Sequence, residues 1–149
     1  MDIFNSEEQE QLAHAIGLAE ARTSGEIRVC VERRCKQDVL IRAQECFFHL
    51  GMHQTALRNG VLLYLSTDDH QFAIIGDQGI DSKVANDFWD LTKEKMLSHF
   101  KSGDLLKGLI TGIACAGEQL QHLFPRAHDD VNELPNDIVF IDRHHTLNS

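Results

Sequence analysis

The sequence has no hydrophobic run long enough to cross a membrane. No stretch approaches the roughly 18 consecutive apolar residues that a bilayer-spanning helix needs. The opening sequence MDIFNSEEQEQ is acidic and lacks both the basic region and the apolar region of a secretory signal peptide. We therefore expect a protein that neither spans a membrane nor is secreted, and we place it in the cytoplasm.

Paired cysteine motifs are also missing. The chain has four cysteines but no CxxC pair, and this spacing favours neither a zinc site nor a disulfide framework. At 149 residues, a single domain buries enough surface to fold without such links. Three of the cysteines lie in apolar-patterned segments, where a free cysteine behaves as a small hydrophobic residue. We expect free thiols at Cys30, Cys35, Cys46 and Cys115.

Basic residues are scarce. The sequence has 14 Lys and Arg against 23 Asp and Glu, for a formal net charge of −9. Proteins that bind nucleic acids gather basic side chains on one face. The composition therefore argues against nucleic-acid binding as a main function.

The signature loops of common enzymes are absent as well. The sequence has no GxxxxGK[ST] phosphate loop, no GxGxxG dinucleotide loop and no GxSxG nucleophile motif. Its nine histidines are scattered, and neither His49 with His53 nor His144 with His145 has the partners of an HExxH zinc motif. No transition-metal enzyme is indicated.

What is present is an alternation of helix and strand patterns. Ser6 and Gln9 have capping-box spacing ahead of a helical apolar repeat, which predicts a helix over residues 6–22. The sequence EIRVCVE, residues 26–32, then alternates apolar and polar residues, as a strand does.

A helix and a hairpin are expected next. Asp38 is placed to cap a second helix that Gly51 ends. The apolar runs GVLLYLS and QFAIIG predict strands over residues 61–66 and 71–76, with turn residues between them. The first two strands enclose a helix, so a right-handed crossover makes them parallel, and the hairpin makes the third antiparallel.

The second half has the pattern of two long helices. The first is predicted to begin near Ser82 and to carry one apolar stripe, made of Ala85, Phe88, Trp89, Thr92, Met96 and Phe100. The sequence KSGD breaks this pattern, and a wider stripe follows from Leu105 to Leu120, ended by Pro125. Small residues on the second helix predict close packing on the sheet, namely Gly108, Gly112, Ala116 and Gly117.

Together these patterns predict a single α/β domain with helices on both faces of a small mixed sheet. We assign the domain to residues 1–124 and a polar tail to residues 125–149. The apolar piece of that tail, residues 138–141, is expected to add a short edge strand.

The predicted topology brings glycines and carboxylates to one end of the sheet. The third strand runs directly into GDQGID, residues 76–81, and this point lies beside the starts of the other two strands. Oxygen ligands suit calcium or magnesium, and the candidates here are Glu26, Asn59, Asp77 and Asp81. Close backbone approach to a ligand is expected at Gly60, Gly76 and Gly79.

A structural interpretation of the same residues stays open. Asp81 would then cap the helix that begins near Ser82, and the glycines would only turn the chain. Under this interpretation Asp77 and Glu26 are solvated.

A second acidic cluster is predicted at the opposite end of the sheet. Asp68 and Asp69 follow the second strand, and the KSGD break delivers Asp104. Ligands of open α/β sheets favour the carboxyl ends of parallel strands. The alternative is again structural, with Asp68 and Asp69 as turn residues and Asp104 as the cap of the last helix.

The order of these pieces resembles the TPM domain family. The likeness rests on SGEIRVCVE, RNGVLLYLS, FAIIGDQGI, a Trp-bearing helix and an FxxGDxxxGL pattern, and it covers about residues 25–120. The tail sequence DDVNELPNDIVF resembles that of short, stand-alone bacterial members. The family usually has Gly-x-Gly and then a glutamate after the third strand, whereas here Gly79 is followed by Ile80 and Asp81.

The resemblance implies an α/β/α sandwich and a broad range of functions. A thylakoid-lumen relative is associated with weak acid phosphatase activity and photosystem II repair, and an animal relative is an accessory subunit of a receptor. Metal binding at acidic residues is proposed within the family. The matching positions here are Glu26, Gly60, Gly76, Asp77, Gly79 and Asp104.

Two functions are therefore expected. The favoured one is a non-catalytic module that binds a protein partner through a sheet edge or a helical face, as an accessory part of a membrane-associated complex. The alternative is a weak acid phosphatase in which Glu26, Asp77 and Asp81 hold a calcium or magnesium ion that polarises a phosphate monoester. The sequence supplies no evident nucleophile or leaving-group acid, which favours the module.

Overall fold

The computed structural model of the chain describes residues 3–126 and 138–141. Its elements are, in order, α1 (Ser6–Glu20), β1 (Glu26–Glu32), α2 (Val39–His49), the 3-10 helix η1 (Met52–Gln54), β2 (Gly60–Ser66), β3 (Gln71–Gly76), α3 (Gln78–Asp81), α4 (Asp90–Lys101), α5 (Leu105–Leu123) and β4 (Val139–Ile141). None of the helices within these ranges is long and apolar enough to cross a membrane.

The strands form one mixed sheet in the order β3-β2-β1-β4. β1 pairs in parallel with β2, and β3 pairs antiparallel to β2. β4 adds in parallel to the outer side of β1, so the edge strand expected in the tail is confirmed. The predicted bounds of β1 and β3 are confirmed, and β2 begins one residue earlier than predicted, at Gly60.

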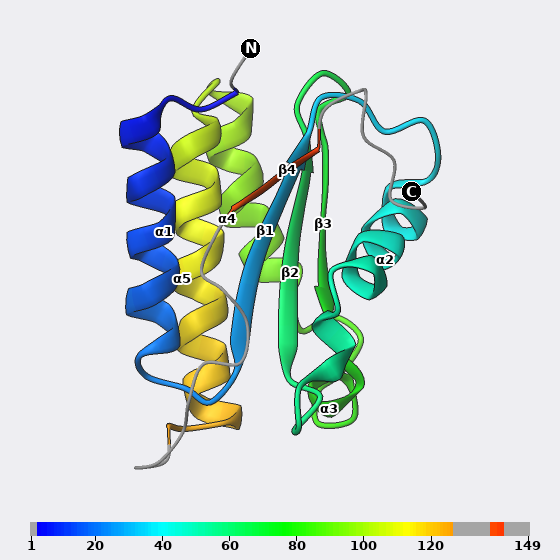
Figure 1. Ribbon diagram of the computed structural model, residues 1–149, viewed down its shortest axis with the longest axis vertical. Helices are drawn as coiled ribbons and strands as arrows, with labels where there is room; N and C mark the ends of the chain where they lie inside the picture. Colours follow the sequence, from blue (N-terminus) through cyan, green and yellow to red (C-terminus); the bar gives the residue numbers. More distant parts are fainter. Residues whose placement is uncertain (1–2, 127–137, 142–149) are drawn as a thin grey trace.

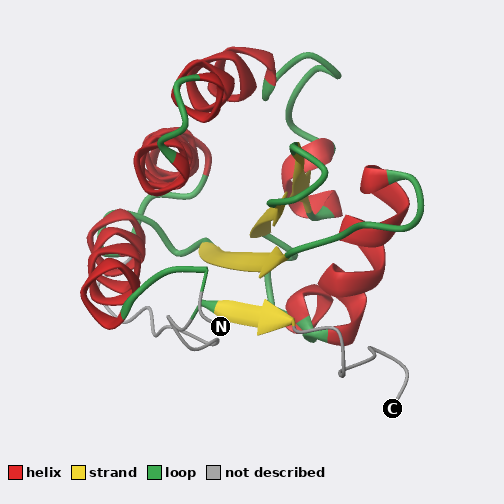
Figure 2. Cartoon of the chain, turned by 90° about the horizontal axis from the view of Figure 1, so that it is seen from above, coloured by secondary structure: helices red, strands yellow, loops and turns green. Residues whose placement is uncertain are grey.

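Helices cover both faces of this sheet, as expected for an α/β/α sandwich (Figures 1 and 2). The apolar core between the sheet and α1, α4 and α5 uses Ile27, Val29 and Val31 of β1. The core under α2 uses the opposite face, with Cys30 of β1 against Cys46 and other α2 residues. β2 is buried along its whole length, as its continuous apolar run predicts. All four cysteines are free, as predicted.

The first helix begins with a different capping box from the predicted one. Asn5, not Ser6, is the N-cap, and its side chain accepts a 2.8 Å hydrogen bond from the backbone N–H of Glu8. The Glu8 carboxylate accepts a 2.9 Å bond from the Asn5 N–H in return. The helix dipole stabilises a carboxylate in the first turn. Gln9 of the predicted box is neutral and would not gain this stabilisation.

The prediction of one long helix from Ser82 is wrong. The chain forms the four-residue α3 directly after β3, and α4 begins only at Asp90. Asp77 accepts a hydrogen bond from the Gln78 N–H at 2.7 Å and caps α3 as soon as the strand ends. Asp81 is therefore the last residue of α3 and does not cap the next helix.

The three glycines among the small residues of α5 make close contacts with other helices, not the predicted contact with the sheet. A Cβ at Gly108 would lie 2.3 Å from the Phe100 ring, and one at Gly112 would lie 2.6 Å from the Met96 sulfur. A Cβ at Gly117 would meet Ala19 of α1 at 2.6 Å. These glycines let α5 lie close to both α4 and α1.

Candidate functional site

The predicted glycine-rich site is assembled at one end of the sheet. Glu26 lies opposite Gly60 in the β1–β2 pair, and Gly76 lies opposite Val61 in the β2–β3 pair. We call this region the glycine end; it consists of Glu26, Asn59, Gly60, Gly76, Asp77, Gly79 and Asp81. Its residues come from the strand starts and strand end that the topology predicted.

Asp77 is held by an arginine that the sequence analysis missed. Arg58 donates two hydrogen bonds to the Asp77 carboxylate, at 2.8 and 2.9 Å. Arg58 has a positive φ of 51°, which is uncommon for a residue with a side chain and turns the chain into β2. Asp77 is buried and also caps α3, so its carboxylate is not solvated and already has hydrogen-bond partners within the chain.

Gly79 is required for this turn to pack. A Cβ at Gly79 would lie 2.2 Å from the carbonyl oxygen of Leu57 and 2.4 Å from that of Arg58. The Gly79 N–H donates to the Arg58 carbonyl at 2.8 Å. The close backbone approach predicted at Gly79 is therefore present, and it is made to the chain itself.

Glu26 is buried beside a second buried carboxyl group, that of Glu20. One Glu20 oxygen accepts a 2.7 Å hydrogen bond from the Ile27 N–H. Burial raises the pKa of Glu20 to about 8. The bond from Ile27 opposes this shift, and the interaction with Glu26 adds to it. The two side chains therefore form a carboxyl pair that retains a proton at neutral pH.

A sequence signal for Glu20 exists. Leu12, Ile16 and Glu20 recur every four residues, so Glu20 continues the buried stripe of α1 toward the sheet. A carboxyl group at such a position indicates a buried polar contact, and Glu26 at the start of the next strand is within reach.

The other glycine-end residues have modest polar contacts. The Asn59 side-chain amide donates to the Ser24 hydroxyl at 3.4 Å, and the Asn59 backbone carbonyl accepts from the Glu26 N–H. Asp81 is exposed, and its pKa is raised by partial burial and by Asp77. On the open side of Gly76, a Cβ would lie 3.4 Å from Trp89 Nε1 and 3.6 Å from an Asp81 oxygen.

The described residues contain no group of three or more His, Cys, Asp and Glu side chains arranged to hold a metal ion. At the glycine end, Asp77 lies near enough to Asp81 to add to the effect of burial, which raises the pKa of Asp81. A calcium or magnesium ion bound between them would compete with Arg58 for the Asp77 carboxylate. The cation site thus stays a prediction.

At the opposite end, which we call the carboxyl end, the three predicted aspartates have separate roles. Asp68 lies 3.8 Å from both Arg33 and Arg34. Asp69 accepts hydrogen bonds from the Cys35 N–H and the Ser66 hydroxyl, and these bonds lower its pKa. Asp104 caps α5 through a 3.0 Å bond from the Lys107 N–H.

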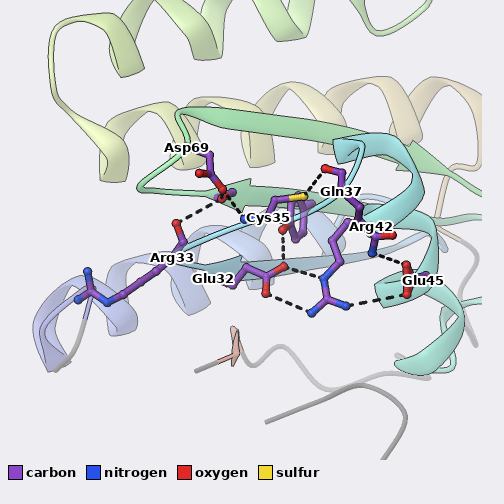
Figure 3. Close-up of polar contacts among 9 residues, drawn as sticks. Glu32, Arg33, Cys35, Gln37, Arg42, Glu45 and Asp69 are labelled. Carbon is purple, nitrogen blue, oxygen red and sulfur yellow. Dashed lines mark hydrogen bonds and ion pairs between the residues drawn. The ribbon is translucent and has the colours of Figure 1, made fainter. Parts of the chain in front are cut away.

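The carboxyl end also holds a buried ionic network that sequence reasoning missed (Figure 3). Arg42 of α2 donates to both oxygens of Glu32 at the end of β1, at 2.8 and 3.1 Å. The Tyr64 hydroxyl of β2 donates to the same carboxylate. Burial and the adjacent Glu32 raise the pKa of Tyr64, so it remains a neutral donor. This network joins α2 to both parallel strands.

Comparison with known proteins identifies the family. The family model of the TPM domain, named TPM phosphatase, matches residues 1–119. The chain belongs to the TPM domain family.

Solved structures share this fold. The NMR structure of the BA42 protein from the psychrophilic bacterium Bizionia argentinensis has a TM-score of 0.89 and 43% sequence identity, covering 94% of this chain and 97% of that one. The N-terminal domain of a protein from P. gingivalis has a TM-score of 0.68 at 16% identity, covering 85% and 83% of the two chains, and shows the fold alone. No curated protein matches the chain.

One face of this TPM domain exposes large apolar side chains. On α2, Leu40, Ile41 and Phe48 are 48%, 53% and 61% exposed. Their spacing of seven and eight residues puts them within about 100° of one another around the helix. Ile41 and Phe48 lie away from the side that packs on the sheet, and Leu40 borders that side. We call these three residues the α2 face.

Proposed function

We propose that this TPM domain is a non-catalytic accessory module that binds a partner protein through the α2 face. The exposure of Leu40, Ile41 and Phe48 is the observation that carries the proposal. Single exposed apolar residues are ordinary on protein surfaces, but a group on one helix face is typical of a protein-binding surface. Desolvating such side chains supplies affinity without any catalytic group.

The contacts of the glycine end support a structural role for its carboxylates. Asp77 is bound by Arg58 and caps α3. Glu26 and Glu20 are both buried, and their carboxyl groups interact with each other. A general acid, base or nucleophile must reach a substrate, whereas these three carboxyl groups contact other groups of the same chain.

We further propose that the module works in the cytoplasm and binds a subunit of a membrane-associated complex. Free thiols at all four cysteines suit a reducing compartment. The resemblance to other TPM domains implies an accessory-subunit role, and this role is the reason to propose a membrane-associated complex as the partner.

Site-specific photo-crosslinking in cells tests the proposal. The photoreactive amino acid p-benzoylphenylalanine replaces Phe48 in one variant and Leu97 in a control, because Leu97 is an exposed apolar residue of α4 on the other side of the sheet. We expect a discrete crosslinked product in the membrane fraction from position 48 only, and its loss when Ile41→Asp is added. Identical products from positions 48 and 97 would contradict the proposal.

The second candidate is the weak, metal-assisted acid phosphatase. Two groups at the glycine end favour it: Arg58, whose side chain is 36% exposed, could contact a phosphate oxygen, and Asp81, with its raised pKa, could donate a proton to the leaving group. Hydrolysis of p-nitrophenyl phosphate with magnesium or calcium checks it. This activity should fall at least tenfold in Asp81→Asn, and equal rates in the two proteins would assign it to a contaminant.

A further inference from the structure

The outer edge of β3 has unused hydrogen-bonding groups. β3 is the last strand of the sheet and pairs only with β2 among the described strands. The Asp77 N–H donates to the Gly60 carbonyl at 3.0 Å, which marks these two residues as a hydrogen-bonded pair of the antiparallel ladder. Because such pairs alternate along the ladder, the backbone N–H and C=O groups of Phe72, Ile74 and Gly76 point away from β2.

The two edges of the sheet are protected differently. β4, at the far edge, has three residues, and very short strands offer little to an incoming chain. β3 has six residues, QFAIIG, with none of the charges or prolines that natural edge strands use against unwanted pairing. No hydrogen bond among the described residues uses the outward backbone groups of Phe72, Ile74 and Gly76.

The open edge of β3 continues onto α2. This helix packs more closely on β3 than on the other strands, and Figure 1 shows the two side by side. Arg42 points from α2 toward Glu32 of β1, so the opposite flank of α2 lies toward the outer side of β3. Leu40 and Gln44 are each about 160° from Arg42 around the helix, which places them on that flank.

The residues that form this edge and flank carry no charge, although the Asp81 carboxylate lies beside the Gly76 end. In the sequence as a whole 25% of residues are charged, yet β3, Leu40, Ile41, Gln44 and Phe48 include none. The surface therefore suits a strand with apolar side chains facing α2, held by backbone hydrogen bonds to β3.

A second copy of this chain is a poor occupant. Each copy carries a formal charge of −9, so two copies repel one another as they approach. A cationic protein would be attracted by the same field, which raises its rate of association. Its apolar side chains would then contact the uncharged edge.

We propose that the partner contributes an extended, alternately apolar segment, flanked by basic residues, that adds to the outer edge of β3 beside Leu40. This inference rests on the proposed binding function and specifies its partner. The added strand bonds to the backbone of Phe72, Ile74 and Gly76 and places every second side chain against α2.

Amide hydrogen exchange on the full-length, isotopically labelled protein tests the inference. The probe is a synthetic peptide of alternating valine and threonine with two lysines at each end. At saturation we expect exchange of the Phe72, Ile74 and Gly76 amides to slow at least tenfold. The amides of Ala73 and Ile75, which already bond to β2, serve as internal controls and should not change.

Two control peptides separate the backbone contact from the charge. A version N-methylated at every second residue cannot complete the ladder and should not protect the three amides. A version with glutamates at its ends should bind at least tenfold more weakly at low salt, and 0.5 M sodium chloride should reduce that difference. Equal protection by the methylated peptide, or equal affinity of the acidic one, would overturn the proposal.

Variants distinguish this inference from the proposed function. Leu40→Ser should weaken peptide binding at least threefold, while Leu97→Ser, an exposed control, should not. If crosslinking from position 48 succeeds but no peptide protects the β3 amides, the strand-addition inference is wrong and the binding function stands. Concentration-dependent protection without peptide, with dimer mass in sedimentation, would show that a second copy occupies the edge and overturn it.

Discussion

The two ends of the sheet each hold a buried carboxylate with a doubly hydrogen-bonded arginine, but they expose that arginine differently. At the glycine end, the Arg58 side chain is 36% exposed beside Asp77. At the carboxyl end, the Arg42 side chain is 16% exposed beside Glu32, which also accepts from Tyr64. The first pair fixes a turn next to β2, whereas the second holds a helix on the sheet.

This difference indicates how firmly each end is built. Water can solvate Arg58 if Asp77 is lost, whereas Arg42 is more shielded from water and would be left without its counter-charge if Glu32 were lost. The carboxyl end is therefore expected to be the rigid end. The glycine end can change protonation or ligation with a smaller loss of stability.

Removal of Arg42 should have the largest effect. We expect Arg42→Ala to lower the free energy of unfolding by about 3 kcal/mol, because the buried Glu32 carboxylate loses two charge-assisted hydrogen bonds. Glu45→Ala is the matched control: its side chain is 41% exposed and 4.0 Å from Arg42, so it should cost about 0.5 kcal/mol or less. Urea denaturation measures both, and equal losses would show that the burial of Glu32 adds no cost to the loss of its counter-charge.

The carboxyl pair of the glycine end should respond to pH. The pKa of Glu20 is raised by burial to about 8 from an ordinary value of 4.5, so the folded state holds a proton that the unfolded state releases. Stability from this group is fully present below pH 4.5 and is lost as the pH rises toward 8. Glu20→Gln keeps an acceptor for the Ile27 N–H and removes the titration.

We expect Glu20→Gln to be more stable than the wild type at pH 8 by at least about 1.4 kcal/mol, the equivalent of one pKa unit. The two proteins should converge below pH 4.5. Chemical denaturation across this range is the measurement, and Glu10→Gln, at an exposed position of the same helix, is the control. A constant difference at every pH would mean that the pair holds no proton.

Calcium should have the smallest effect. A cation at the glycine end must compete with Arg58 for Asp77, so we expect millimolar calcium to raise the thermal midpoint only slightly. A concentration equal to the dissociation constant contributes about 0.4 kcal/mol. Asp77→Asn should abolish the response, while Asp68→Asn at the carboxyl end should retain it and change stability by about 0.5 kcal/mol or less. A wild-type midpoint that ignores calcium would remove the cation site from the proposed functions.

Much of the fold could be predicted because its signals are local. The alternation of EIRVCVE and the apolar run QFAIIG set the bounds of β1 and β3. Asp38 caps α2, and Asp104 caps α5. Where several local signals compete, the prediction fails. Asp77 could cap a helix as well as Asp81, and the chain used Asp77 because it leaves β3 in an extended conformation.

The candidate site was only partly predictable. Topology alone brought Glu26, Gly60, Gly76 and Asp77 to one end, because strand direction follows from the crossover and the hairpin. It did not indicate that Arg58 reaches Asp77, since that contact occurs in a turn with a positive φ at Arg58 and a close approach of the Arg58 carbonyl to Gly79.

The sequence by itself determined the order of the strands and of the longer helices, the two faces of the sheet and the family, because periodicity and short motifs are properties of neighbouring residues. Only the tertiary structure decided which charges meet. Glu20 pairs with Glu26, and Glu32 with Arg42, across the gap between a helix and a strand. Such pairs depend on helix rotation and on the depth of packing, and a rotation of one residue, about 100°, would separate them.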